Sequence, residues 1–159
     1  MTSIHTPHHR LVLADVENLL GAAIPSRQEV VQIRQQLFTL LGDTSDTLFE
    51  VACSHLAAPA VRFGFPEGRH QWRSGTDGAD LALIGVIADE HVAERFRTVV
   101  VASGDGIFAA PVSDLTARGV ECTVISRRQS LSNRLRLAAT HVVFLDDDDF
   151  NEGVLLDAA

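Results

Sequence analysis

R-L-V-L-A-D at residues 10–15 is an unbroken apolar run that ends in an aspartate, Asp15. A second run, T-V-V-V-A at residues 98–102, is followed within three residues by another aspartate, Asp105. Neither run alternates apolar with polar side chains, which is typical of parallel strands covered by helices on both faces. We therefore predict a parallel α/β sheet with acidic residues where its strands end.

Similar apolar runs alternate with helical patterns along the rest of the chain. We predict strands at residues 10–15, about 47–53, near 70–73, 98–102, 120–125 and 141–145. Helices are expected at about 27–41, 54–63, 78–96, 107–118 and 130–139. With right-handed crossovers, these elements make a three-layer α/β sandwich. The length of 159 residues predicts one domain, at residues 10–146, with flexible tails at 1–9 and 147–159.

A third stretch, G-T-D-G-A-D-L-A-L at residues 75–83, is a glycine-containing turn that opens a helix with Asp80 in its first turn. Ligands of parallel sheets bind beyond the carboxyl ends of the strands. If the strands ending near Asp15 and Asp105 are neighbours, their backbones lie about 4.8 Å apart, and Asp80 closes the site from the flank. Such acids repel one another unless a cation joins them or their pKa values rise. Mg²⁺ and Mn²⁺ prefer carboxylate oxygens as ligands, so we expect one of them at this site, which points to phosphodiester hydrolysis.

Each of these acids also has a purely structural interpretation. Asp15 suits a turn after a strand, Asp105 suits a helix N-cap, and Asp80 complements a helix dipole. We favour ligand roles for these three because ionisable clusters mark functional sites. We assign the neighbouring Asp77 mainly to the helix dipole.

Two polar residues near the acids are also candidates for the site. Asn18 is equally suited to holding a phosphate oxygen and to bonding the local backbone. Ser103 is either a phosphate contact or a turn hydroxyl.

The basic residues narrow the chemistry further. All thirteen are arginines, so the chain lacks the lysine of a Walker-type phosphate loop, a Schiff-base enzyme or a phosphorelay receiver domain. Arg73, Arg127 and Arg128 follow predicted strands and are expected at the carboxyl edge. There they could bind backbone phosphates of a nucleic acid. The alternative is a solvated charged surface.

The net charge of −8 does not decide whether the chain binds nucleic acid. Without six acidic residues at the C-terminal end, the rest of the chain carries a net charge of only −2. These six are Asp146, Asp147, Asp148, Asp149, Glu152 and Asp157. We interpret this end as a solvated acidic tail. The chain shows neither a secretory signal pattern at its start nor an apolar run of about 20 residues, so we expect a cytoplasmic protein without a membrane span. Cys53 and Cys122 lie in apolar strands and are expected to be buried free thiols.

Three motifs in order along the chain resemble those of the NYN domain family, a branch of the PIN-like metal-dependent ribonuclease superfamily. D-V-E-N-L at residues 15–19 resembles the opening D-x-x-N motif. D-G-A-D-L-A-L at 77–83 resembles the middle K-G-x-D-x-x-L motif and places Asp80 on its acid. S-G-D-G-I-F at 103–108 resembles S-G-D-x-D-F and places Asp105 on its first acid.

The resemblance implies a sheet of order 3-2-1-4-5, to which a further edge strand can be added, and an acidic cleft that binds Mg²⁺ or Mn²⁺ and cleaves RNA. This chain departs from the pattern at three positions: Ile107 replaces the second acid of the last motif, Asp77 replaces the lysine of the middle motif, and Thr140 stands where a further acid is often found. Glu17, two residues beyond Asp15, is a candidate to complete the ligand set.

We therefore expect a metal-dependent ribonuclease that acts on single-stranded RNA, from a GC-rich bacterial source that would account for the arginine-only composition. The alternative is a catalytically degenerate NYN domain that binds RNA or protein. A homo-oligomer or a protein partner is compatible with either function.

Overall fold

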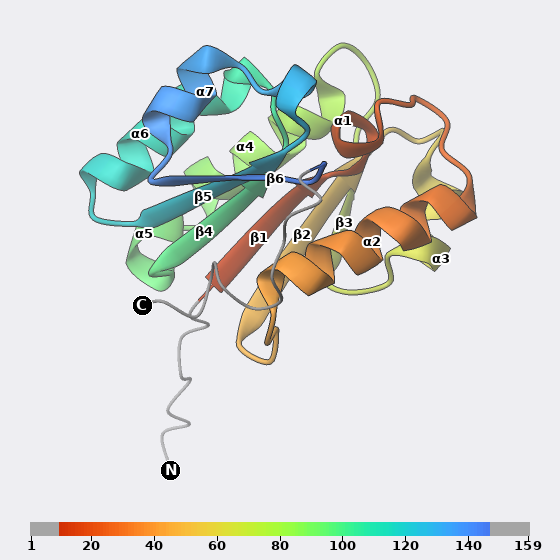
Figure 1. Ribbon diagram of the computed structural model, residues 1–159, viewed down its shortest axis with the longest axis horizontal. Coiled ribbons are helices and arrows are strands. Elements are labelled where there is room, and N and C mark those ends of the chain that lie inside the picture. The colour runs from red at the N-terminus through yellow and green to blue at the C-terminus, as the bar shows by residue number, and fades with distance from the viewer. Residues whose placement is uncertain (1–9, 147–159) are drawn as a thin grey trace.

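The computed structural model describes residues 10–146 as a six-stranded parallel sheet between two layers of helices (Figure 1). The strands are β1 (Arg10–Asp15), β2 (Thr47–Cys53), β3 (Arg69–Trp72), β4 (Thr98–Ala102), β5 (Glu121–Ser126) and β6 (His141–Phe144). Their order is β3-β2-β1-β4-β5-β6, and every neighbouring pair is parallel. The predicted order 3-2-1-4-5 with one further edge strand is therefore confirmed. The predicted tails at 1–9 and 147–159 lie outside the described residues, as does the acidic run beyond Asp146.

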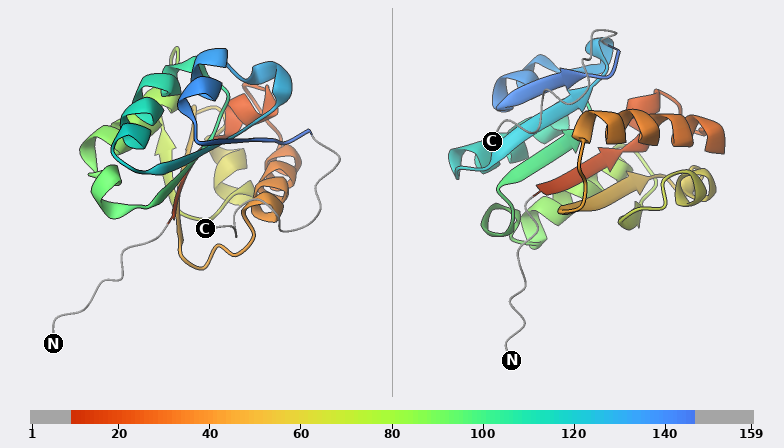
Figure 2. Two further views of the ribbon diagram at one scale, coloured as in Figure 1. Left: turned by 60° about the vertical axis from the view of Figure 1, so that its left-hand side comes forward. Right: turned by 60° about the horizontal axis from the view of Figure 1, so that its bottom comes forward.

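The helices divide between the two faces of the sheet (Figure 2). One face carries α1 (Val16–Leu20), α2 (Arg27–Leu41) and α3 (Ala58–Gly64). The other carries α4 (Gly78–Asp89), α5 (Val92–Arg95), α6 (Ala109–Ala117) and α7 (Asn133–Ala138). Two short 3₁₀ turns, η1 (Gly106–Phe108) and η2 (Arg128–Ser130), follow β4 and β5. The result is the three-layer α/β sandwich that the sequence predicts.

The central strand β1 explains why its sequence does not alternate. Leu11 and Leu13 pack toward α4–α7, whereas Val12 and Ala14 pack toward α1–α3, and all four side chains are buried. Because successive side chains of a strand point to opposite faces, a strand covered on both faces needs apolar residues at every position. Because β1 lies inside the sheet between β2 and β4, its end, and with it Asp15, lies in the middle of the carboxyl edge.

The structure corrects the predicted helix between residues 78 and 96. It ends at Asp89, and His91 adopts a left-handed conformation with φ of 53° before α5 begins. Glu90, at the break, is bonded by Arg69 on the edge strand β3. The turn lets Val92 and Phe96 re-enter the core, and both are buried. Tertiary contacts therefore override a continuous helical pattern.

The helices flanking the sheet differ from the prediction in smaller ways. The sequence pattern missed α1, a single short helix that starts directly after Asp15 and ends at Gly21 in the left-handed conformation. The predicted helix at 54–63 starts later, at Ala58, with Pro59 in its first turn. The predicted helix at 130–139 is shortened to α7, because 128–130 forms η2.

Two further observations bear on the expected class of protein. No helix between residues 10 and 146 combines the length and apolar character needed to cross a membrane. Cys53 and Cys122 are both free and buried, as predicted.

Candidate functional site

β1 and β4 are neighbours in the sheet, with Ala14 opposite Ala102. The segments that follow them therefore leave the carboxyl edge side by side (Figure 1). The buried Ser103 hydroxyl lies 3.5 Å from Oδ2 of Asp15, to which it donates, and it accepts from the backbone N–H of Asp105 at 3.3 Å. One hydroxyl thus connects the first and third acids of the predicted site.

Four carboxylates gather at this edge. One oxygen from each of Asp77, Asp80 and Asp105 lies within 4.8 Å of the others. The fourth, Asp15, lies within hydrogen-bonding reach of Asp80. Asp15 and Asp80 are 4% and 5% exposed, whereas Asp77 is exposed at the rim. A hollow of about 210 Å³ opens over Asp15, Asp77 and Asp80.

The turn that delivers Asp80 depends on glycine. A Cβ at Gly78 would lie 2.5 Å from the backbone oxygen of Arg73, so only glycine permits the approach of α4 to the end of β3. Gly75 has a φ of 100°, which also favours glycine. The short path from β3 to α4 then places Asp80 in the first turn of α4, facing inward.

Asp77 is part of the acidic cluster, which the sequence interpretation missed. It precedes α4 with a left-handed φ of 56°, and its side chain makes no capping hydrogen bond. It still stands at the start of α4, where an acid complements the helix dipole, and it also belongs to the acidic cluster. A non-glycine residue in this conformation is uncommon and is often found at functional sites. Only the backbone geometry, which the sequence does not display, distinguishes Asp77 from a capping residue.

Burial and mutual repulsion perturb the acids. Burial, hydrogen bonding with Asp15 and the charges of Asp15 and Asp105 together raise the pKa of Asp80 to about 9. Burial also raises the pKa of Asp15, although hydrogen bonding from Asp80 and from the backbone N–H of Asn18 opposes it. The Oδ1 atom of Asp80 is buried, and no described residue bonds to it. Such an oxygen is costly unless something compensates for the lost water.

A divalent cation fits this arrangement. The available donors are carboxylate oxygens, which Mg²⁺ and Mn²⁺ prefer. A cation would offset the burial and the repulsion that raise the pKa of Asp80, and the unpartnered Oδ1 atom would gain a ligand. The donor set therefore matches the metal expected from the sequence.

Glu17 and Asn18 frame the hollow through bonds to other loops. Oε1 of Glu17 accepts from the backbone N–H of Ser54 at 2.8 Å. Oδ1 of Asn18 accepts from the backbone N–H of Gly104 at 3.0 Å. Asn18 therefore joins the loops after β1 and β4 through a bond to a backbone 86 residues away, and both residues line the hollow.

The three candidate arginines differ in their surroundings. Arg73 is exposed and lines the acidic hollow. Arg127 is half-buried against α1, where its Nη2 atom donates to the backbone oxygen of Asn18 at 3.4 Å. Arg128 is exposed, with its guanidinium 4.2 Å from the centre of the Phe144 ring. Only Arg73 thus borders the acids directly.

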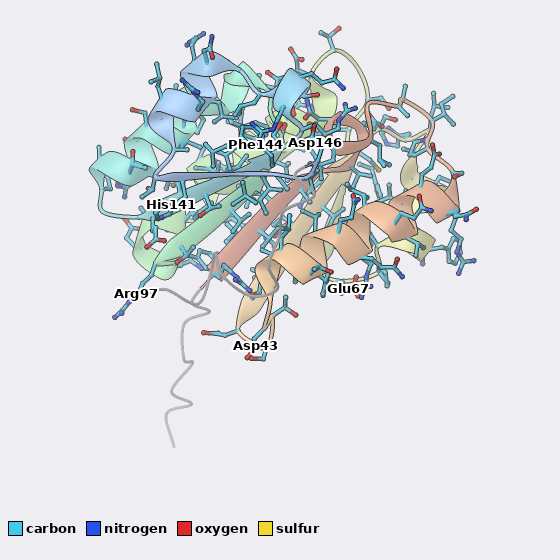
Figure 3. The ribbon with its side chains drawn as sticks, in the orientation of Figure 1. Asp43, Glu67, Arg97, His141, Phe144 and Asp146 are labelled. Carbon is cyan, nitrogen blue, oxygen red and sulfur yellow. The ribbon has the colours of Figure 1, made fainter. Side chains whose placement is uncertain are left out.

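The end of β6 approaches the same edge of the sheet. Oδ1 of Asp146 accepts from the backbone N–H of Arg128 at 3.1 Å. Figure 3 labels Phe144 and Asp146 at this end and Arg97 and Asp43 at the opposite, amino end of the strands. Arg128 and its partners therefore belong to the carboxyl edge, farther along it than Arg73.

A thiol mechanism finds no support in the structure. Burial raises the pKa of Cys53 to about 12, with contributions from the charges of Glu17 and Asp15. Burial likewise raises the pKa of Cys122 to about 12. Since the thiolate is the nucleophilic form, neither cysteine is activated.

Comparisons with known proteins bear on the fold and the family of the chain. The fold is similar to a crystal structure of a protein of unknown function from Vibrio parahaemolyticus, with a TM-score of 0.61 and 20% sequence identity over 94% of this chain and 99% of that one. No curated protein gives a significant match. The sequence model of the NYN domain matches residues 11–146, which is most of the chain. The chain therefore belongs to the NYN domain family of PIN-like nucleases.

Proposed function

We propose that this chain is a metal-dependent ribonuclease that hydrolyses phosphodiester bonds of single-stranded RNA at the acidic hollow. The observation that carries the proposal is Asp80, a buried carboxylate that meets two other carboxylates and has one oxygen without a described partner. A fold retains such an arrangement poorly unless a ligand compensates for it. The position of the hollow, beyond the carboxyl ends of β1 and β4, is where open α/β sheets bind ligands.

Asp15, Asp80 and Asp105 are the proposed ligands of Mg²⁺ or Mn²⁺. Asp77 joins them, because its carboxylate lies in the same cluster and supplies an acid where Ile107 does not. Glu17, on the rim of the hollow, adds negative charge beside Asp15 and completes the set. When bound, the cation polarises the scissile phosphate and lowers the pKa of the attacking water.

The other residues position the acids and the substrate. Ser103 and Asn18 fix the loops that carry Asp15 and Asp105 through the hydrogen bonds described above. Contact of either residue with a phosphate remains part of the proposal.

The arginines are proposed to bind the phosphates of the RNA. Arg73 is placed to bind the phosphate beside the metal, because it borders the acids and a guanidinium binds phosphate in two-point fashion. Arg127 and Arg128 are assigned to flanking phosphates farther along the edge. The described residues offer no element that would enter a double-stranded groove, which favours a single strand.

The test is incubation of the purified protein with a labelled single-stranded RNA, in Mn²⁺ and in EDTA. We expect cleavage in Mn²⁺ alone, its loss in Asp15→Asn, and its retention in Asp43→Asn. Asp43 is a matched control because it is exposed at the opposite end of the sheet (Figure 3). Equal cleavage by wild type and Asp15→Asn would mean that the activity comes from another site or a contaminant.

A second candidate is a catalytically silent NYN domain that binds RNA or protein. The observation that favours it is Ile107, whose half-buried side chain packs against the core beneath α4–α7 at the position of the family's second acid. Binding of the RNA without cleavage under any divalent cation would support this candidate and contradict the first.

A further inference from the structure

A groove runs between the edge strand β3 and helix α4, beside the acidic hollow. Its volume is about 350 Å³, which lies within the range of small-molecule sites. Gln71 and Arg73 line it from the strand side, and Leu81, Gly85 and Asp89 line it from the helix. Arg73 also lines the acidic hollow, so the two depressions adjoin one another.

Gly85 lies in the interior of α4 and has no packing explanation. A Cβ built there would meet nothing within 4 Å, in contrast to Gly78, where a Cβ would collide with the backbone of Arg73. Glycine in a helix interior is less stable than alanine, so open space at this position does not favour the fold. It does keep the groove wide and lets a ligand approach the helix backbone closely.

The part of the groove formed by Arg73, Leu81 and Gly85 matches the parts of a nucleotide, whereas Asp89 and Glu90 line the part at the far end of α4. Leu81 is a large apolar side chain that is 37% exposed beside the open surface of Gly85, which suits the flat face of a base. Gln71 donates from Nε2 to the buried Glu50 at 3.2 Å, so its amide is held beside the groove. Arg73, between the groove and the acids, supplies a cation for the phosphate that joins two nucleotides.

We propose that this groove holds the nucleotide adjacent to the scissile phosphate, with its base over Gly85 and Leu81. The inference rests on the proposed ribonuclease function, because it places the scissile phosphate at the acids. It adds a specificity-determining surface, since a base fixed here selects which bond enters the hollow. The glycine at position 85 is then a requirement of the ligand and not of the fold.

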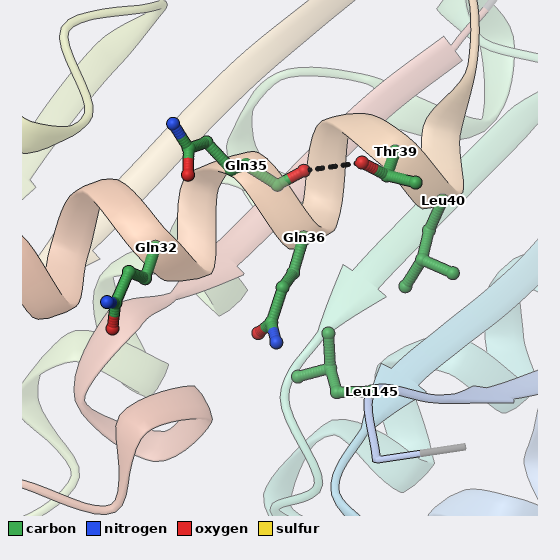
Figure 4. A pocket seen from close by; sticks show the side chains of 6 residues that line it. All are labelled: Gln32, Gln35, Gln36, Thr39, Leu40 and Leu145. Atoms are coloured by element: carbon green, nitrogen blue, oxygen red, sulfur yellow. Dashed lines mark hydrogen bonds between the residues drawn. The ribbon is translucent and has the colours of Figure 1, made fainter. Parts of the chain in front are cut away.

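A second hollow in the protein provides a control surface. It has a volume of about 380 Å³ and lies along α2, where Gln36 and Leu40 point toward Leu145 (Figure 4). Like the proposed groove, it offers amide and apolar side chains. However, it belongs to the opposite face of the sheet and shares no lining residue with the acidic hollow. Filling it should leave RNA binding unchanged.

The experiment compares Gly85→Leu with Gly85→Ala and with the control Gln36→Leu. The probe is a short fluorescein-labelled single-stranded RNA, whose anisotropy is titrated in Ca²⁺ so that binding is measured apart from cleavage. We expect Gly85→Leu to weaken binding about tenfold or more, as for loss of one base contact. Gly85→Ala should have a smaller effect, and Gln36→Leu none. Thermal unfolding should show that none of the three is destabilised, and Leu81→Glu gives a second test of the same groove.

Hydrolysis of bis(p-nitrophenyl) phosphate in Mn²⁺ separates failure of the groove from failure of the nuclease. Its hydrolysis by wild type and the loss of that hydrolysis in Asp15→Asn report on the acids without requiring that RNA bind. RNA binding that is unchanged in both Gly85→Leu and Leu81→Glu overturns the groove proposal and leaves the nuclease intact. If wild type hydrolyses neither RNA nor the small diester, the nuclease proposal fails. In that case the groove proposal is still judged by whether Gly85→Leu and Leu81→Glu weaken RNA binding in the anisotropy titration.

Discussion

Glu50 and Asp80 are two buried carboxylates on the same side of the sheet, and their partners are opposite in kind. Glu50, in β2, is fully buried and is bonded by the guanidinium of Arg69 and the amide of Gln71. Asp80, at the start of α4, is 5% exposed and meets the carboxyls of Asp15 and Asp105. The buried charge of Glu50 is therefore compensated by an arginine and an amide, whereas the similarly buried Asp80 faces other acids.

We propose that the difference separates an acid that stabilises the fold from an acid that binds a cation. Arg69 also bonds Glu90, so the Glu50 network ties β2 and β3 to the end of α4. Its charges are satisfied before any ligand arrives. Among the described residues no arginine or histidine is bonded to Asp80, and we propose that a cation takes that place. If so, replacing Asp80 should mainly lower activity, whereas removing the partner of Glu50 should mainly lower stability.

The largest effect is expected from Asp80→Asn. Loss of a proposed metal ligand should lower Mn²⁺-dependent RNA cleavage on the order of a thousandfold, which corresponds to about 4 kcal/mol of transition-state stabilisation. Stability without metal should not fall, and above about pH 4 it should exceed that of wild type, because asparagine keeps the shape without the charge that the fold disfavours. Cleavage rates and urea denaturation in EDTA measure the two effects. A variant that cleaves as wild type would exclude Asp80 from the site.

Arg69→Met should have the opposite profile. It leaves Glu50 buried with only the amide of Gln71, which should lower the free energy of unfolding by about 3 kcal/mol. Cleavage per folded molecule should change little, because Arg69 lies outside the acidic hollow. Arg118→Met is the control: Arg118 pairs with two exposed acids, and its loss should cost no more than about 1 kcal/mol. Equal urea midpoints for the two variants would contradict the structural role of Glu50.

The sequence predicts one member of this pair better than the other. Asp80 belongs to a motif whose spacing from Asp15 and Asp105 resembles that of a known family, so its neighbours could be inferred. Glu50 is a single acid within a strand, and its partner Arg69 lies 19 residues away in a short edge strand. Nothing local indicates that pairing, because the sheet register creates it.

The same reasoning separates the predictable part of the fold from the rest. Strands that are buried on both faces leave a pattern in the sequence, so the parallel sheet was predicted from it, whereas the strand order was implied by the family resemblance. The break at His91, the left-handed Asp77 and the groove beside Gly85 arise from tertiary packing. For Asp77 and Gly85, the residue type was visible but its geometric reason was not. The roles assigned to the site residues stay predictions until the cleavage experiments are made.

The pH dependence of stability offers a smaller test. The pKa of Asp80 is raised from 3.8 in the unfolded chain to about 9 in the folded protein, so between these values the folded state holds the additional proton. In EDTA, its contribution is present below about pH 4 and is lost as the pH rises toward 9, with a slope of at most about 1.4 kcal/mol per pH unit. Asp80→Asn should flatten this slope in urea denaturation series.

Mn²⁺ should reverse the trend, because a cation binds the ionised carboxylates and releases their protons. Stabilisation by Mn²⁺ should therefore increase with pH over the same window, and it should be much reduced in Asp80→Asn. If stability in EDTA is instead independent of pH and equal in wild type and variant, Asp80 is not held in its protonated form by the fold.

The smallest effect is expected at Ile107, where the cluster meets the core. Ile107→Asp adds an acid two residues after Asp105 and should raise cleavage several-fold at low Mn²⁺, if the site is short of ligands. It should also cost about 1 kcal/mol of stability, because the half-buried side chain packs against the core. Ile107→Asn shares the packing loss without the charge, so the ratio of their cleavage rates over a Mn²⁺ titration isolates the added carboxylate. A ratio of one would show that Asp77 already supplies the missing ligand, whereas absence of cleavage in wild type and in both variants would favour the silent binding domain.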